Sequence, residues 1–507
     1  MTNRFSLPPD SIAVPAPLPD NLGAVRFANG ATELTIPLLA AIAIDRALVY
    51  VDDGTVSEIR EAHEAATTIS RRIAVYGRTT GVGANRTVDV DANDPDHGMR
   101  ILRSHAADAG APVPSRAVRG MLAVRLRQLC VPGSGIRPDV LTGLATMLND
   151  DALPEVRTFG SVGTGDLAAL AGTALTLVGE REASRPVRPL PQFGADSALA
   201  FISSSALTLA RAALALHNLE ALERSSAHIF ALTARAINAN PEHWSPAAAA
   251  ATSSTGTEAV TAAIRRALPN PECAARIQDP YGIRAYPHVH GTFHDARRRV
   301  ADLVTALMNT AQENPLFLFK GEGSAVHHAA FFQADLAQSI DALTLALANT
   351  MPLTTARIRM LSEPSYTGRQ PFLSSPHAGA SGVLIVEYIA AAAGAELRTS
   401  ATPASLGTVV LSRGMEEDAP FATQSVTHLE RAVDALRITF GCELLVAVRT
   451  LRQQGKWDAV KDQPGLRTLD RALPSGDDDR DLRMELKVSI DLAASIGNES
   501  RMGTDHS

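Results

Sequence analysis

The sequence predicts a mainly α-helical protein. Of its 507 residues, 45% are hydrophobic but only 4% are aromatic. Ala and Leu are abundant and recur at helical spacing, whereas runs of β-branched residues are few. Small side chains let helices pack closely against one another. The length is sufficient for one large hydrophobic core or for several domains.

Charge and cysteine content exclude several classes of function. The net charge of -7 and the pI near 6.1 provide no basic field for nucleic acid. Cys130, Cys273 and Cys442 are far apart and form no C-x-x-C motif, so neither a disulfide framework nor a thiolate metal site is expected. No N-terminal signal pattern is visible, and Arg211 interrupts the apolar run 203–216. A soluble, cytoplasmic protein is therefore expected.

The order of elements follows from composition and periodicity. A Pro-rich arm is expected over residues 1–30, with its prolines concentrated before about Asp20. A short β-like segment and a helix capped by Asp53 follow. The sequence divides into an active-site domain over 31–200, a helical bundle over 201–490 and a flexible tail over 491–507. Long core helices are predicted for Ala198–Leu216, for Ala334–Met360 and around Val433–Ala447.

The central motif lies within Val156–Glu180, which reads VRTFGSVGTGDLAALAGTALTLVGE. Glycines allow a tight turn before an apolar helix, and Asp166 stands where a helix N-terminus favours a carboxylate. Taken alone, the stretch also suits a loop that merely caps a buried helix.

Two further motifs carry residues suited to acid-base chemistry and to carboxylate binding. Tyr76 lies on the glycine-rich loop Val75–Asn85, where it can be presented to a cavity or remain a half-buried ring with a bonded hydroxyl. In Gln278–Arg284, Arg284 can hold a carboxylate in a bidentate pair and Tyr281 can donate beside it.

These motifs resemble the histidine, phenylalanine and tyrosine ammonia-lyase family. GSVGTGDLAALA is similar to the family's GS(V/I)GASGDLAPLA, VYGRTTGVG to VYG(V/L)(N/T)TGFG, and QDPYGIR to QDPYSLR. The resemblance extends from about Leu34 to about Gln454. It implies a histidine ammonia-lyase-like elongated helical bundle, a homotetrameric core, and active sites that are each assembled from three chains.

The same resemblance implies roles for individual residues. Tyr76 corresponds to the base that removes a β-proton, Tyr281 to a hydrogen-bond donor beside the substrate, and Glu417 to a carboxylate that meets an imidazole or an amine. His105 stands where the family distinguishes substrates, although a lone His on a helix is often structural. The implied substrate contacts are His105, Ser203, Gln278, Arg284 and Asn309.

The chain departs from the family where the prosthetic group forms. The family's Ala-Ser-Gly cyclises to an electrophilic methylidene-imidazolone. Here the family's Gly-Ala-Ser-Gly-Asp is Gly163-Thr164-Gly165-Asp166, which is one residue shorter and has Thr in place of Ser. Thr would add a methyl group to the electrophilic carbon, so we expect the group to be absent, with its formation kept as the alternative. Ser203 replaces an Asn, and a hydroxyl cannot offer an amide's separate donor and acceptor. Further departures occur at Ala325, Val326 and Ala419.

Neither a metal nor a nucleotide is expected. His288, His290 and His294 form an H-x-H-x-x-x-H pattern, but no carboxylate or Cys completes a recognised metal-binding spacing. Two functions therefore remain open. The chain is either a divergent carbon–nitrogen lyase, which includes a form that works without the electrophile, or a catalytically silent tetramer that binds an amino acid through Arg284.

Overall fold

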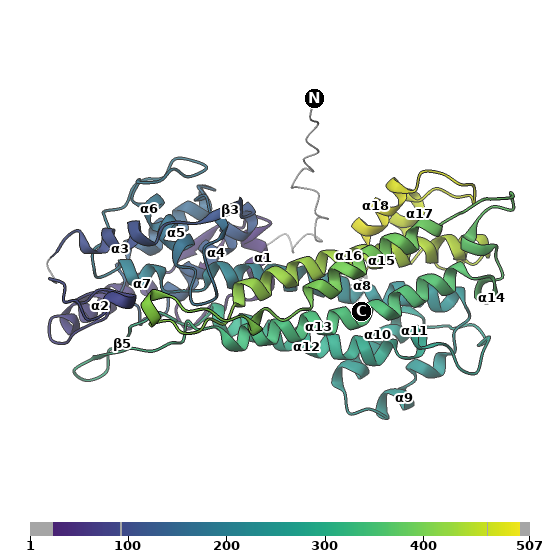
Figure 1. Ribbon diagram of the computed structural model, residues 1–507, viewed down its shortest axis with the longest axis horizontal. Helices are drawn as coiled ribbons and strands as arrows, with labels where there is room; N and C mark the ends of the chain where they lie inside the picture. The colour runs from purple at the N-terminus through teal and green to yellow at the C-terminus, as the bar shows by residue number, and fades with distance from the viewer. Residues whose placement is uncertain (1–23, 92–93, 464, 497–507) are drawn as a thin grey trace.

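The computed structural model describes residues 24–91, 94–463 and 465–496. The molecule is elongated, with long helices along its length and smaller elements gathered at both ends (Figure 1). This architecture confirms the predicted mainly α-helical fold. The Pro-rich segment before Asp20 and the last residues of the predicted tail lie outside the described residues, whereas Val25 already belongs to a strand.

One end is formed by the N-terminal part of the chain. A short parallel pair of strands positions the first helix, because Val25 pairs with Val49 and Phe27 with Val51. Thr35 caps that helix by accepting a hydrogen bond from the N–H of Leu38. The elements of this end are β1 (Val25–Phe27), α1 (Ile36–Ala43), β2 (Val49–Val51), α2 (Asp53–Ser70), η1 (Gly83–Asn85), α3 (His97–His105), β3 (Ala109–Pro112), α4 (Ser115–Leu129), α5 (Asp139–Asn149), β4 (Arg157–Phe159), α6 (Leu167–Leu177) and α7 (Ala198–Ile202).

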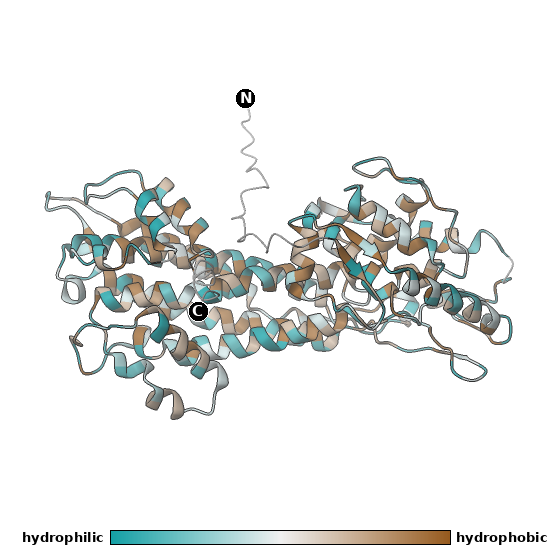
Figure 2. Cartoon of the chain, turned by 180° about the vertical axis from the view of Figure 1, so that it is seen from behind, coloured by the Kyte–Doolittle hydropathy of each residue, from teal (hydrophilic) through white to brown (hydrophobic). Residues whose placement is uncertain are grey.

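Long helices form the middle of the molecule, and Figure 2 shows hydrophobic and hydrophilic residues interspersed along them. Their buried faces are rich in Ala and Leu, which accounts for close packing of helices with few aromatic residues. The helix predicted for Ala334–Met360 is confirmed as Ala334–Ser362, and the one around Val433–Ala447 is longer than predicted. These helices are α8 (Ala206–Ala236), α12 (Tyr286–Met308), α13 (Ala334–Ser362), α15 (Leu384–Ser400) and α16 (Ala422–Gln453).

The remaining elements lie beside and beyond these long helices. The hairpin of β5 and β6 belongs to the N-terminal end, and the short C-terminal helices lie at the other end (Figure 1). The elements are η2 (Pro241–Trp244), α9 (Pro246–Ala250), α10 (Thr255–Ala267), α11 (Tyr281–Arg284), β5 (Leu316–Leu318), β6 (Ser324–Val326), α14 (Pro364–Thr367), η3 (Pro371–Leu373), η4 (Ala404–Leu406), η5 (Ser412–Gly414), η6 (Trp457–Ala459), α17 (Leu466–Ala472) and α18 (Arg483–Leu492).

Two sequence predictions about helix boundaries are wrong. Asp52, not Asp53, caps α2, because the Asp52 carboxylate accepts hydrogen bonds from the N–H groups of Gly54 and Thr55. The predicted helix Ala198–Leu216 is interrupted at Ser203, whose φ of -79° and ψ of 72° are not helical. Periodicity alone does not reveal this break.

One helical stretch among the described residues is long and apolar enough to cross a membrane. It is Ala198–Ala236, and 94% of its apolar window is buried inside the molecule. Such burial is typical of a core helix.

Candidate functional site

Tyr76 lies on the glycine-rich loop that follows α2. Its half-buried phenol oxygen accepts a hydrogen bond from the N–H of Gly83 at 2.6 Å, and its own N–H donates to Nε2 of His327 at 3.2 Å. Gly77 has a φ of +73°, and a Cβ there would lie 2.2 Å from the side chain of Leu199. Glycine at position 77 therefore lets the Tyr76 loop lie directly against α7.

Arg78 anchors the Tyr76 loop, a role that the sequence motifs did not indicate. Its buried guanidinium donates to the carbonyl oxygens of Gly135 at 2.9 Å and Ser134 at 3.2 Å, and lies 4.5 Å from the centre of the Phe317 ring. Burial lowers the pKa of Arg78 to about 10, and the nearby negative charge of Asp196 partly opposes this shift. The available signal was an Arg where the similar loop motif has Val or Leu.

Hydrogen bonds with Ser161 and with the start of α16 hold the turn Gly163-Thr164-Gly165 in place. The hydroxyl of Ser161 donates to the carbonyl of Gly165 at 3.1 Å and accepts from the N–H of Gly163 at 3.2 Å. The N–H of Phe421 donates to the carbonyl of Val162 at 2.9 Å. The start of α16 therefore holds this turn in place.

Asp166 lies at the N-terminus of α6, as the sequence indicates, but its side chain makes no capping hydrogen bond. Its buried carboxylate accepts hydrogen bonds from the N–H of Thr208 at 2.8 Å and from the Thr208 hydroxyl at 2.9 Å. Burial raises the pKa of Asp166, and the two bonds from Thr208 oppose that shift. Its N–H donates to the carbonyl of Ser204 at 2.7 Å, so Asp166 ties the Thr164 turn to the break before α8.

Ser203 contacts the loop that carries Asn314, and a buried ion pair fixes the position of this loop. The Ser203 hydroxyl accepts from the N–H of Asn314 at 3.1 Å. The adjacent Glu313 pairs with Arg125 at 2.8 Å, and both side chains are almost fully buried. Arg125 also donates to the carbonyl of Phe201 at 2.9 Å. This network fixes the position of Ser203 relative to the Thr164 turn.

Glu417 is exposed on the loop between α15 and α16. This loop contacts the Tyr76 loop, because the hydroxyl of Ser412 accepts from the N–H of Ala84 at 3.0 Å. Its other end reaches the Thr164 turn through Phe421 and Val162. The loops that carry Tyr76, Thr164 and Glu417 therefore meet at one end of the molecule.

His105 and Asn309 each have partners within the chain. Nδ1 of His105 lies 2.8 Å from the carbonyl of Ile101 at the end of α3. The amide oxygen of Asn309 accepts from the N–H of Leu34 at 2.8 Å and from Nε of Arg127 at 2.9 Å. Asn309 therefore links the segment at Leu34 to α4 through hydrogen bonds. Contact of either His105 or Asn309 with a substrate stays a prediction.

The carboxylate-binding motif lies far from Tyr76. Figure 1 places α11, which carries Tyr281 and Arg284, at the opposite end of the long helices from α2, α6 and α7. Gln278 and Tyr281 are exposed, and the Arg284 guanidinium lies 4.2 Å from the centre of the Tyr281 ring. Nε of Arg284 is buried and has no hydrogen-bond partner within the described residues. A single chain does not bring these two groups together.

The three histidines of the H-x-H-x-x-x-H pattern do not converge. His294 pairs with Glu223, whereas the ring of His290 is buried and stacks 3.9 Å from that of Tyr286. His288 is exposed. Across residues 24–91, 94–463 and 465–496, no group of three or more His, Cys, Asp or Glu side chains is arranged to hold a metal ion.

His290 makes stability depend on pH. Burial, with the nearby charge of Arg357, lowers the pKa of His290 well below its usual value. Below about pH 6.5 the unfolded chain binds a proton that the folded chain does not, so stability falls by up to about 1.4 kcal/mol per pH unit. His290→Met is expected to flatten this slope in urea unfolding between about pH 6.5 and pH 5. The matched change at the exposed His288 should leave the slope as it is, and an unchanged slope in His290→Met would contradict the prediction.

The residues around Thr164 do not fit a methylidene-imidazolone. Gly163 has a φ of +92°, and a Cβ at this position would lie 2.6 Å from the N atom of Ala422. A side chain on the residue before Thr164 would therefore collide with the start of α16, and the Ala of the family's Gly-Ala-Ser-Gly-Asp has no counterpart in the shorter Gly163-Thr164-Gly165-Asp166. Thr164 itself would give a methyl-substituted carbon in place of the methylidene group.

A bundle of long helices that ends in a tyrosine loop, a glycine turn and an acidic loop defines the class of helical carbon–nitrogen lyases. The model of the aromatic amino acid lyase family matches residues 34–471. The chain belongs to the aromatic amino acid lyase family. Both the resemblance and the lyase class that the sequence predicts are confirmed.

Individual relatives agree with this assignment. The histidine ammonia-lyase of Symbiobacterium thermophilum is 31% identical over 444 residues, which cover 83% of this chain and 87% of the relative. Tyrosine aminomutase from Streptomyces globisporus has a TM-score of 0.86 at 23% identity, covering 95% of this chain and 100% of that one. Ergothionase from Treponema denticola, an ergothioneine-degrading enzyme, has a TM-score of 0.85 at 22% identity, covering 93% and 99%. The two solved structures show the shared fold.

Proposed function

We propose that this protein is a lyase that eliminates an amine from an aromatic or histidine-like amino acid without a methylidene-imidazolone. The observation that carries the proposal is the meeting of the Tyr76, Thr164 and Glu417 loops around a turn that does not suit the electrophile. A tyrosine with a fixed hydroxyl is retained in this arrangement, while the group that activates the substrate in the family is not.

Tyr76 acts as the base in this proposal. Its deprotonated phenol oxygen takes the β-proton of the substrate, and the electrons of that C–H bond form the Cα=Cβ double bond. The Cα–N bond breaks at the same time, and the amine leaves with its electron pair. The N–H of Gly83 donates a hydrogen bond to the phenol oxygen at 2.6 Å and so fixes the position of the oxygen that takes the proton.

The substrate carboxylate is held by Arg284 of another subunit in this proposal. Nε of Arg284 is buried and has no hydrogen-bond partner, and Tyr281 is exposed beside it. The two side chains can therefore donate hydrogen bonds to a carboxylate. Because Tyr76 lies at the opposite end of its own chain, a homotetramer would bring the two groups together. Gln278 would accompany Arg284, whereas His105 and Glu417 would contact the ring or the amine of the substrate.

Elimination without covalent activation restricts the substrate. Ammonia is a poor leaving group, and acid-base catalysis contributes only about 10²- to 10⁴-fold. The amine must therefore leave easily, for example as a tertiary amine from a quaternary ammonium group, or the β-proton must already be acidic. Ergothioneine belongs among the test compounds because a relative in fold is named as degrading it.

A cytoplasmic location is part of the proposal. Cys130 and Cys442 are buried free thiols, and Cys273 is an exposed one. Burial raises the pKa of Cys130 and of Cys442 to about 12, which makes both thiols unreactive. A reducing compartment keeps such thiols free.

The test combines mass spectrometry with a panel of substrates. The peptide that contains Gly163-Thr164-Gly165 is expected to have the mass of its unmodified residues. Histidine should not react, whereas its trimethylammonium analogue or ergothioneine should give an unsaturated acid and a tertiary amine, followed by absorbance.

Two outcomes would contradict the proposal. Loss of water from the Thr164 peptide, with borohydride-sensitive turnover of histidine, would mean that the electrophile forms. Tight amino-acid binding without turnover, which survives Tyr76→Phe but not Arg284→Ala, would identify a catalytically silent binding protein.

A further inference from the structure

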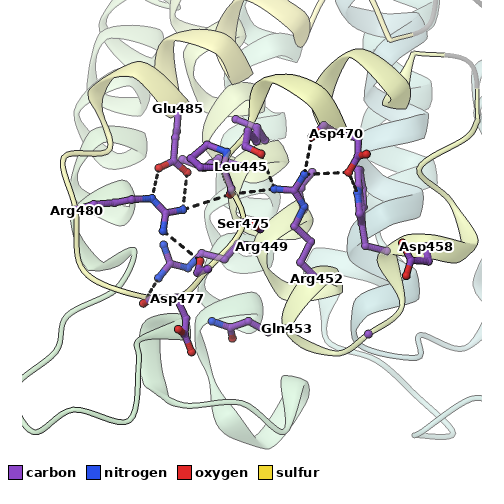
Figure 3. A pocket seen from close by; sticks show the side chains of 16 residues that line it. Leu445, Arg449, Arg452, Gln453, Asp458, Asp470, Ser475, Asp477, Arg480 and Glu485 are labelled. Carbon is purple, nitrogen blue, oxygen red and sulfur yellow. Dashed lines mark hydrogen bonds and ion pairs between the residues drawn. The ribbon is translucent and has the colours of Figure 1, made fainter.

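A cavity lies at the end of α16 that is remote from the Thr164 turn. It has a volume of about 560 Å³ and is enclosed by α16 and the C-terminal segment between Asp470 and Glu485 (Figure 3). This volume is within the range of about 300 to 1,000 Å³ typical of small-molecule sites. Because α16 begins at Ala422 beside the Thr164 turn, the full length of the helix separates the cavity from the candidate active site of the same chain.

Two of the three arginines that line this cavity are already neutralised. Arg452 pairs with Asp470 at 3.1 Å and also donates to main-chain carbonyls. Arg480 forms a two-pronged pair with Glu485. Figure 3 shows both pairs on the wall of the cavity, with their dashed lines between side chains. Neither arginine needs a ligand to balance its charge.

Arg449 differs from them, although it lies between them in the same wall. It is 6% exposed, and it donates through Nε to the carbonyl of Leu373 at 3.2 Å and through Nη2 to the carbonyl of Asp477 at 2.7 Å. Its Nη1 is buried without a hydrogen-bond partner. None of the ion pairs within the described residues includes Arg449, and the carboxylates of Asp477, Asp479 and Glu485 act on its charge only without direct contact, so Nη1 is left as a buried donor without an acceptor.

The other side of the cavity is apolar. Leu445 and Val448 of α16 and Leu473 of the C-terminal segment are buried and line it. Four acidic residues, Asp458, Asp470, Asp477 and Glu485, are among those that line the cavity, and their charge disfavours a ligand with several negative charges. The combination suits a molecule with a single oxyanion group on an apolar body.

We propose that this cavity binds a small molecule that carries one carboxylate or phosphate group. The oxyanion accepts hydrogen bonds from Nη1 of Arg449, and the body of the ligand lies against Leu445, Val448 and Leu473. A guanidinium bond to an oxyanion is charge-assisted and stronger than one between neutral groups. This site is independent of the elimination reaction, because none of its residues takes part in it.

The test measures binding to the full chain by calorimetry and thermal unfolding, with benzoate and inorganic phosphate as probes. One molecule per chain is expected to bind and to raise Tm. Benzoate binding alone would assign the site to carboxylates, and phosphate binding alone would assign it to phosphates. Arg449→Gln should weaken binding by about tenfold or more, whereas Arg471→Gln, an equal charge change on exposed α17, should leave it unchanged.

Two further variants keep the result decisive. Ser475→Glu places a carboxylate on the exposed rim of the cavity, and it should raise Tm and abolish binding even if Arg449→Gln fails to fold. Arg284→Ala should leave the binding intact, which separates this cavity from the proposed active site. Equal binding by Arg449→Gln and the unaltered chain, loss of binding in Arg284→Ala, or no binding of either probe would overturn the proposal.

Discussion

Tyr76→Phe is expected to lower kcat by about 10²- to 10⁴-fold, the contribution typical of a positioned proton acceptor. The change removes only the hydroxyl, whose hydrogen bond within the chain is to the N–H of Gly83. The half-buried ring remains packed, so Tm should shift little. Steady-state kinetics on the substrate found in the panel, together with thermal unfolding of both proteins, would measure the two quantities.

The same variant can test how the active site is assembled. Arg284→Ala should raise KM through loss of the carboxylate pair, while its own Tyr76 remains intact. If each site combines Tyr76 of one chain with Arg284 of another, then mixed assemblies of the two impaired variants contain some complete sites. At a substrate concentration below the raised KM, the two variants refolded together should therefore be more active than either variant refolded alone. Mixtures no more active than the variants refolded alone would contradict a shared site.

Glu443→Gln is expected to reduce the free energy of unfolding by about 3 to 5 kcal/mol, the usual cost of breaking a buried ion pair on one side. Glu443 accepts from Nε of Arg357 at 2.6 Å, from Nη2 at 2.7 Å and from the Thr233 hydroxyl at 2.8 Å. The variant leaves the Arg357 charge, 1% exposed, without a counter-charge. Chemical unfolding of the variant would give the loss directly.

This ion pair also bears on the substrate clamp. Nη1 of Arg357 donates to the carbonyl of Gly282 at 3.1 Å, within α11 between Tyr281 and Arg284. Activity that survives in Glu443→Gln should therefore show a raised KM. As a control, Arg357→Met combined with Glu443→Leu removes both charges and should recover much of the stability. A double variant as unstable as Glu443→Gln would show that charge imbalance is not the cause.

Much of the fold follows from periodicity, because long amphipathic helices repeat their pattern over many turns. The break at Ser203 could not be predicted in this way. Ser203 accepts a hydrogen bond there from the N–H of Asn314, more than one hundred residues along the chain, and a local sequence pattern does not reveal such a contact. The shift of the α2 cap from Asp53 to Asp52 reflects two adjacent aspartates, between which composition does not decide.

The candidate site was predictable as a set of residues but not as an arrangement. Motif resemblance identified Tyr76, Thr164 and Glu417, and their loops do meet. It did not reveal that Arg284 lies at the other end of the same chain, since spacing along a sequence does not say where a long helix ends. The unpaired charge of Arg449 was also invisible, because ion pairing is decided by tertiary contacts.

The separation of Tyr76 and Arg284 along the bundle has a kinetic consequence. If Tyr76 is the base and Arg284 the carboxylate clamp, as proposed, a single chain cannot bring both to one substrate molecule and is inert on its own, so that catalysis requires the assembly. Specific activity would then fall on dilution below the concentration at which subunits associate, and newly made chains would stay silent until they assemble. In a cell that also produced an inactive variant of this chain, each variant chain in an assembly would inactivate several active sites.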